Sequence, residues 1–135
     1  MKTWRRRTRR GAAMAEAAIT LPVVVLLTFA MANLAMAWYA AVAASNAANY
    51  GARMGSVSQT DPIGTAVSAA QVRLDSISIG SYSINGSGGG FRGAQVNISV
   101  DWSVPNYIGG LMALFGGDPL SFSGTALSSF RQEGW

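Results

Sequence analysis

The hydrophobic and polar positions divide the chain into one long apolar run and a shorter, mixed remainder. From Ala17 to Ala44 no residue is charged, and the run is interrupted only by Thr20, Pro22, Thr28 and Asn33. As an α-helix this run would be about 40 Å long, whereas the hydrocarbon core of a bilayer is roughly 30 Å thick. The pattern therefore predicts a helix that spans a lipid bilayer.

Residues within this helix predict its shape and its depth in the membrane. Pro22 lacks a backbone N–H group, so we expect a kink or a loosened turn there. Trp38 and Tyr39 lie near the point where the helix should leave the lipid, as interface anchors do. Because Gly51 and Gly55 weaken helical structure, we place the helix over residues 12–56.

The remaining pattern, over residues 57–135, predicts a small extracytoplasmic α+β domain. Asp61-Pro62 is a suitable N-cap and first-turn pair for a helix over residues 62–76. Alternating apolar residues predict strands over residues 77–84 and 96–102, joined by a glycine-rich turn at 85–90, and a third strand over residues 120–130. We expect a short antiparallel sheet that depends on the long helix for its stability.

The charges limit the classes of function. Six of the ten basic residues lie within residues 2–10, and the other four, set against six acidic residues, give the rest of the chain a net charge of −2. This distribution places the N-terminus in the cytoplasm and leaves no basic surface for nucleic acid. The chain has no cysteine and no histidine. We therefore expect no metal site, no cofactor and no catalytic residues, and an enzyme is the class that fits least well.

Glu16 is the one acidic residue close to the apolar run. A carboxylate at mid-membrane costs roughly 2.5–3.5 kcal/mol and less near the interface, so it needs a partner or a purpose. One interpretation is that Glu16 reaches the headgroups or pairs with Arg9 or Arg10 on its own helix. The residues around it offer another. Basic residues precede Gly11, and Glu16 is the fifth residue after that glycine.

This layout resembles the class III signal of prepilins. The stretch from Gly11 to Glu16, with Pro22 six residues later, resembles the TadE-like pseudopilins, minor pilins of the tight-adherence (Tad, or Flp-type) pilus system. The similarity continues through residues 46–53, which end in Gly-Ala-Arg, and is faint near residues 125–133. Ala17 departs from the pattern, since many relatives have an aromatic residue after the glutamate.

The resemblance implies a pilin-like fold and a role in pilus assembly. A prepilin peptidase would cut between Gly11 and Ala12, removing a basic leader of residues 1–11, and Glu16 would then pair with the new amine of Ala12 or of a neighbouring subunit. The implied partners are that peptidase, other Tad/Flp pilins and pseudopilins, and the inner-membrane assembly platform. The protein would be single-pass in the cytoplasmic membrane and, after assembly, part of an extracellular pilus.

An alternative is an exported or singly anchored small β-rich binding domain. Ala35-Met36-Ala37 forms an A-x-A site before Trp38, and the basic N-terminus and apolar run suit a Sec- or Tat-type signal. However, signal h-regions span about 7–15 residues, fewer than are present here. The two hypotheses predict different N-termini for the mature chain.

Overall fold

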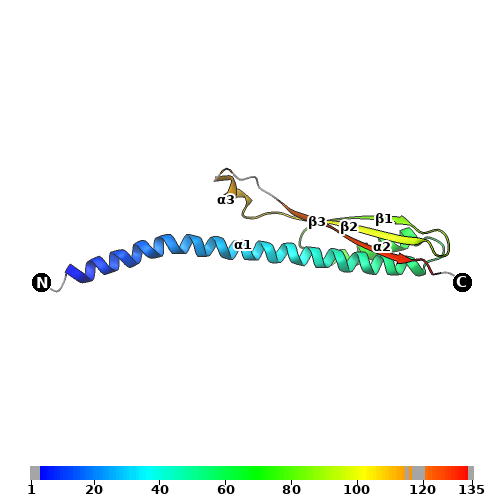
Figure 1. Cartoon of the computed structure of the whole chain (residues 1–135), viewed down its shortest axis with the longest axis horizontal. Coiled ribbons are helices and arrows are strands. Elements are labelled where there is room, and N and C mark those ends of the chain that lie inside the picture. The colour runs from blue at the N-terminus through cyan, green and yellow to red at the C-terminus, as the bar shows by residue number, and fades with distance from the viewer. Residues whose placement is uncertain (1–3, 115, 117–120, 134–135) are drawn as a thin grey trace.

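The fold consists of one long helix and a small domain that packs against it. The computed structural model describes residues 4–114, 116 and 121–133, with the elements in the order α1, α2, β1, β2, α3, β3. Figure 1 shows a small domain lying along the C-terminal half of α1, while the N-terminal half of the helix projects away from it. This is the expected α+β architecture: a long apolar N-terminal helix, a second helix and a three-stranded antiparallel sheet.

The end of α1 and the start of α2 lie close to their predicted positions, whereas α1 begins at Trp4, eight residues before the predicted start at residue 12. Helix α1 (Trp4–Val57) is continuous through Pro22, and its last turn closes with the Ser58 N–H donating to the Gly55 carbonyl at 3.2 Å. Helix α2 (Pro62–Leu74) begins at the predicted cap, where the carboxylate of Asp61 accepts a hydrogen bond from the backbone N–H of Gly64 at 2.8 Å. Both boundaries follow from local sequence chemistry.

The sheet contains β1 (Ser81–Gly88), β2 (Gln95–Val104) and β3 (Phe122–Arg131), with β2 in the centre. The predicted turn at 85–90 is wrong for residues 85–88, which continue β1 in antiparallel register with residues 96–99 of β2. Gly86 lies close to α2, because a Cβ atom there would be 2.9 Å from Ile63 Cγ2 and 3.0 Å from Val67 Cγ2. The glycine therefore lets helix and strand approach closely, and the chain reverses later, where Gly88 and Gly89 have positive φ.

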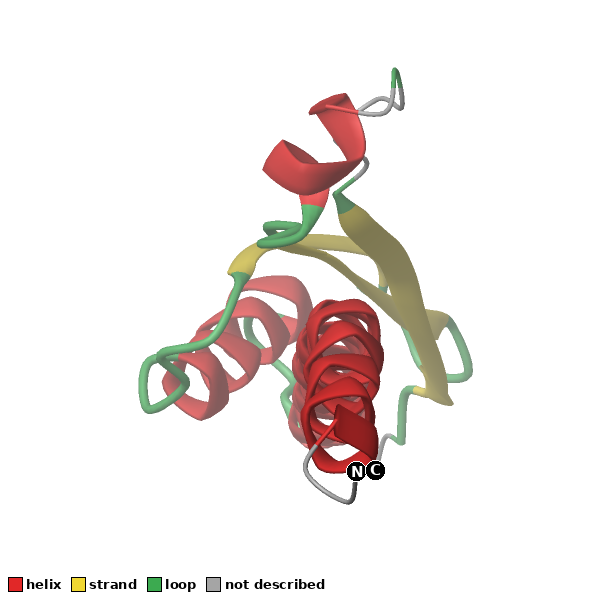
Figure 2. Cartoon of the chain, turned by 90° about the vertical axis from the view of Figure 1, so that its left-hand side faces the viewer, coloured by secondary structure: helices red, strands yellow, loops and turns green. Residues whose placement is uncertain are grey.

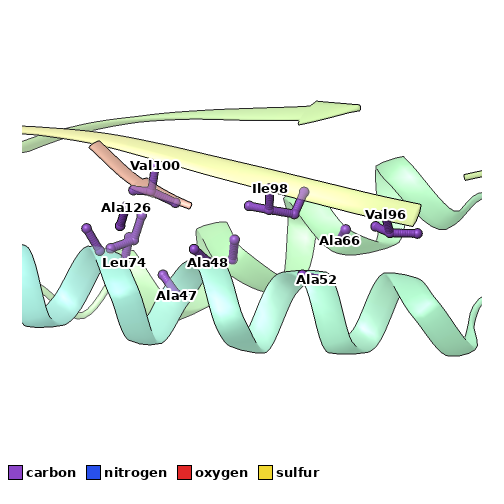
Figure 3. Packing of buried hydrophobic residues seen from close by; sticks show 11 residues of the cluster. Ala47, Ala48, Ala52, Ala66, Leu74, Val96, Ile98, Val100 and Ala126 are labelled. Atoms are coloured by element: carbon purple, nitrogen blue, oxygen red, sulfur yellow. The ribbon is translucent and has the colours of Figure 1, made fainter. Parts of the chain in front are cut away.

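Helices α1 and α2 cover one face of this sheet (Figure 2). The central strand alternates as predicted, and it buries Val96, Ile98 and Val100 completely. Figure 3 shows these three side chains above the alanines of α1. The core is thin, because most of the helix residues facing the sheet are alanine: Ala44, Ala47, Ala48, Ala52, Ala66 and Ala70.

The two helices cross at small residues. A Cβ atom on Gly51 would lie 2.6 Å from the carbonyl oxygen of Ala66, and one on Gly55 would lie 2.6 Å from that of Pro62. Ordinary van der Waals contact begins near 3.4 Å, so no larger residue fits without moving a helix. The glycines that weaken α1 as a helix therefore allow α2 to pack against it.

The outer face of the sheet is polar. Its central row aligns Ser83, Asp101 and Thr125 across the three strands, and the Thr125 hydroxyl donates to the carboxylate of Asp101 at 2.5 Å. The neighbouring rows consist of serine and asparagine except at Leu127 on β3. Polar residues on this face and apolar ones on the other are the pattern of a sheet with one solvated face.

Candidate processing and assembly segment

Residues 11–32 of α1 are not covered by the domain. Every residue from Gly11 to Ala32 is exposed, and Asn33 is the first buried residue. The large apolar side chains in this stretch are exposed by between 36% at Leu26 and 76% at Met14. Such continuous apolar exposure along a helix requires lipid or other protein surfaces to cover it. It fits a single-pass membrane anchor.

The predicted processing residues lie at the N-terminal end of this exposed stretch. Gly11 is within α1, and a Cβ atom on it would meet nothing within 4 Å. Packing therefore does not explain why this position is glycine. Ala12 and Glu16 are both exposed and are four residues apart. In a helix this spacing puts the two residues on one face, one turn apart.

Other predicted features of the helix are also accessible on its surface. Pro22 lies within the exposed stretch. The hydroxyl of Thr28 is satisfied locally, since it donates to the Val24 carbonyl at 2.8 Å. Trp38 is 73% exposed and Tyr39 is 47% exposed. Both aromatic rings are thus free to contact an interface.

Among the described residues, no three or more aspartate, glutamate, histidine or cysteine side chains lie together in a way that could hold a metal ion. Tyr82 has a shifted pKa, and its hydroxyl donates to the Ile79 carbonyl at 2.8 Å. Burial raises the pKa of Tyr82, and the charge of nearby Tyr39 raises it further. This tyrosine is a structural part of the sheet and not a reactive group.

The family model of TadE-like proteins matches residues 11–53. The chain carries a TadE-like segment. The match begins at Gly11 and includes Ala12, Glu16 and Pro22, so it confirms the resemblance on the residues that suggested it, and it associates the chain with the Tad pilus system. No curated protein and no solved structure matches the chain.

The TadE-like segment (residues 11–53) has two structurally different halves. Residues 11–32 are exposed, whereas the second half packs against the chain's own domain. Alanines along a helix can offer small-residue faces to other helices. Those that are buried by the domain are unavailable for such contacts: Ala37, Ala40, Ala44, Ala47, Ala48 and Ala52. Ala30, Ala32 and Ala35 remain exposed.

The C-terminal end of the TadE-like segment holds the domain in place. The Asn49 amide oxygen accepts a hydrogen bond from the Ser128 hydroxyl at 2.7 Å. The guanidinium of Arg73 on α2 lies 4.2 Å from the centroid of the Tyr50 ring, a cation–π contact. Together with Gly51, these residues connect α1 to both β3 and α2. The small and polar residues before Arg53 are therefore explained by docking of the domain on the helix.

Sequence reasoning missed two polar contacts of the domain. Gln132 is 7% exposed; its side chain donates to the Ser58 carbonyl at 3.1 Å and accepts from the Gly90 N–H at 2.9 Å. Asn33 is 1% exposed, and its amide donates to the Asn106 side-chain oxygen at 2.7 Å. The position of Asn33 within a long apolar run was a signal that its side chain needs a polar partner. The sequence does not identify that partner, Asn106, because it lies far away along the chain.

Proposed function

We propose that the protein is a minor pilin or pseudopilin that takes part in assembly of a Tad/Flp-type pilus, after a prepilin peptidase cuts between Gly11 and Ala12. The observation that carries this proposal is the match of residues 11–53 to the TadE-like family, because it covers the signal-like residues and the exposed helix together. The C-terminal domain, which packs on the helix, would then be the part of the subunit that lies outside the membrane.

Accessibility of Gly11 supports the cleavage step. Proteases bind an extended backbone, so the helix must unwind locally around the scissile bond. Gly11 favours unwinding, since glycine is about 1 kcal/mol less favourable than alanine within a helix. No tertiary contact at Gly11 opposes local unwinding of the helix. Arginines in residues 5–10 would hold the leader at the anionic cytoplasmic leaflet, at about 1 kcal/mol for each charge near the surface.

The spacing of Ala12 and Glu16 supports a role for Glu16 after cleavage. Once the chain begins at Ala12, its terminal amine lies one helical turn from the carboxylate, on the same face. Either this amine or that of a neighbouring subunit can then compensate the carboxylate when the helix is surrounded by apolar helices. Removing one partner of a buried ion pair typically costs about 3–5 kcal/mol, so the pair would favour correctly registered subunits.

The same arrangement supports a single-pass topology in the cytoplasmic membrane, with the basic end inside. Lipid would cover residues 11–32 before assembly, and neighbouring pilins would cover them afterwards. The processed N-terminus, the exposed apolar helix and the domain together define a subunit that the membrane assembly platform can extract and add to a filament.

The mass of the protein extracted from native membranes tests this proposal. A mature chain that begins at Ala12 is the expected result, and deletion of the prepilin peptidase should leave Met1–Gly11 attached. A chain that begins at Trp38 would instead establish an exported β-rich binding domain with a cleaved signal. That cut would remove Asn33 and Ala37, which are 1% and 5% exposed because the domain packs on them. An uncut chain would indicate a simple membrane anchor.

A further inference from the structure

The connection between β2 and β3 leaves the domain in the direction of the membrane. It contains α3 (Gly109–Leu114). Figure 1 shows α3 beyond the end of the sheet, level with the part of α1 that lies N-terminal to the domain. In Figure 2, α3 stands clear of both α1 and α2. The backbone of α3 is thus carried outward beside α1 and not folded onto the core.

Two hydrogen bonds fix where this connection begins. The Asn33 amide donates to the Asn106 side-chain oxygen at 2.7 Å, and the Tyr107 N–H donates to the Asn33 oxygen at 3.5 Å. The same Asn106 oxygen accepts from the Ile108 N–H at 3.0 Å, which stabilises the turn into α3. The start of the connection is therefore held at the level of residue 33 of α1.

Residue 33 lies at the outer edge of the exposed apolar stretch. Residues 11–32 would span about 33 Å as a helix, close to the roughly 30 Å of a hydrocarbon core. If lipid covers this stretch, Asn33 and Asn106 meet at the outer boundary. If the hydrocarbon core of the bilayer instead ends at Trp38, the pair of Asn33 and Asn106 lies about 8 Å deeper in the membrane. Under both placements Asn106 reaches the boundary, and α3 extends further toward the lipid.

The composition of α3 suits lipid and not water. Its sequence is Gly-Gly-Leu-Met-Ala-Leu, without a polar side chain. A helix this short is not stable alone in water. Tyr107, just before it, is 66% exposed, and Ala113 within it is also exposed. An amphipathic ring followed by an apolar turn is the arrangement of a segment that lies in the membrane interface.

We propose that residues 107–114 insert into the outer leaflet, close to the headgroups, and form a second membrane contact beside α1. This contact would lie apart from α1 on the same side of the domain as the exposed stretch of the helix, and it rests on the proposed anchoring of that helix in the membrane. Two points of attachment would fix the tilt and rotation of the domain above the bilayer. Extraction of a subunit into a filament would then require release of α3 as well as of α1.

The absence of cysteine allows a direct test with single labels. Ala113→Cys and Gly110→Cys place an environment-sensitive fluorophore on α3, and a Cβ at Gly110 would meet nothing within 4 Å. Val25→Cys provides a reference in the lipid, and Gln59→Cys provides one in water at the far end of the domain; both positions are exposed. The full chain is reconstituted into phosphatidylcholine–phosphatidylglycerol vesicles and quenched by aqueous iodide or by lipids with a nitroxide near the headgroup.

The expected result is that both α3 labels are several-fold less quenched by iodide than the label at 59, and are quenched strongly by the nitroxide lipids. Iodide quenching equal to that at 59 would overturn the proposal. So would protection from both quenchers, because α3 would then be covered by protein and not by lipid. If the label at 25 is also open to iodide, the membrane anchoring itself fails, and both proposals fall together.

Discussion

The crossing of α1 and α2 makes a sharp prediction about Gly51. Replacing it by alanine changes two free-energy terms of opposite sign. Alanine is a better helix former, which alone would stabilise α1 by about 1 kcal/mol. The added methyl group, however, would lie 2.6 Å from the carbonyl oxygen of Ala66 and 2.9 Å from the Cβ atom of Ala70. The prediction depends on which term is larger.

The steric term is larger because the nearest atom belongs to a backbone. A flexible side chain could rotate away, whereas the Ala66 carbonyl moves only if α2 shifts as a body. Overpacking of this kind costs about 1–3 kcal/mol, and a rigid backbone neighbour places Gly51→Ala in the upper part of that range. After the gain in helix propensity, we expect a net loss of about 1–2 kcal/mol in the free energy of unfolding.

Thermal unfolding of the full chain in detergent micelles measures this loss. Near-UV circular dichroism should be followed, since α1 can stay helical in the micelle after the domain has unfolded. For a domain of this size each kcal/mol lowers Tm by about 4–8 °C. Gly11→Ala is the matched control, because it gains the same propensity without a neighbour within 4 Å, and its domain Tm should not change. A Tm for Gly51→Ala equal to or above that of the parent would refute the argument from close packing.

Three further predictions address assembly, the core and pH. Glu16→Ala and Glu16→Gln should both be cut at Gly11 yet be depleted at least about tenfold from sheared pili, because each would leave the amine of the proposed ion pair without its partner, at a cost of about 3–5 kcal/mol. Normal incorporation of Glu16→Gln would show that the charge is unnecessary. Ile98→Ala removes the largest fully buried side chain among the residues whose burial is described and should lower the free energy of unfolding in denaturant titrations by about 2–5 kcal/mol. Leu127→Ala, at a position 78% exposed, should change it little. Because the pKa of Tyr82 is raised in the fold, the contribution of Tyr82 to the free energy of unfolding should be intact below the unfolded pKa of about 10 and should decline as the pH rises above it. A Tyr82→Phe variant that loses as much stability at alkaline pH as the parent would contradict this.

The sequence predicts those parts of the fold that depend on local chemistry. The helix over the apolar run, the Asp61-Pro62 cap and the alternation in β2 each depend on residues close together in the chain, and the structure has all three. The extension of β1 through Gly86 was missed because the reason for that glycine is α2, which lies more than ten residues earlier. The contacts of Asn33 and Gln132 were missed for the same reason. Their partners become neighbours only after the domain has docked on α1.

The candidate site was predictable to a different extent. Gly11, Ala12 and Glu16 form a local motif, so the sequence was sufficient to single them out, and the family match covers them. The roles proposed for them involve a peptidase and other subunits, which lie outside the single chain. The structure adds that Gly11 has no packing neighbour and that the apolar surface around Glu16 is free. We therefore expect binding partners, and not folding, to limit which residues are tolerated at these positions.

The division of the TadE-like segment has a consequence for how its residues should be interpreted. Ala35 is exposed, whereas Ala44 is fully buried against the domain, although both look like the same kind of small helix residue. A larger side chain at Ala35 should leave the folding of the domain unchanged, so any effect on pili would come from the proposed contacts with lipid or other subunits. At Ala44 the same change would separate the sheet from α1 and unfold the domain first. Loss of pili after a change beyond Asn33 thus indicates an assembly contact only when the domain is shown to remain folded.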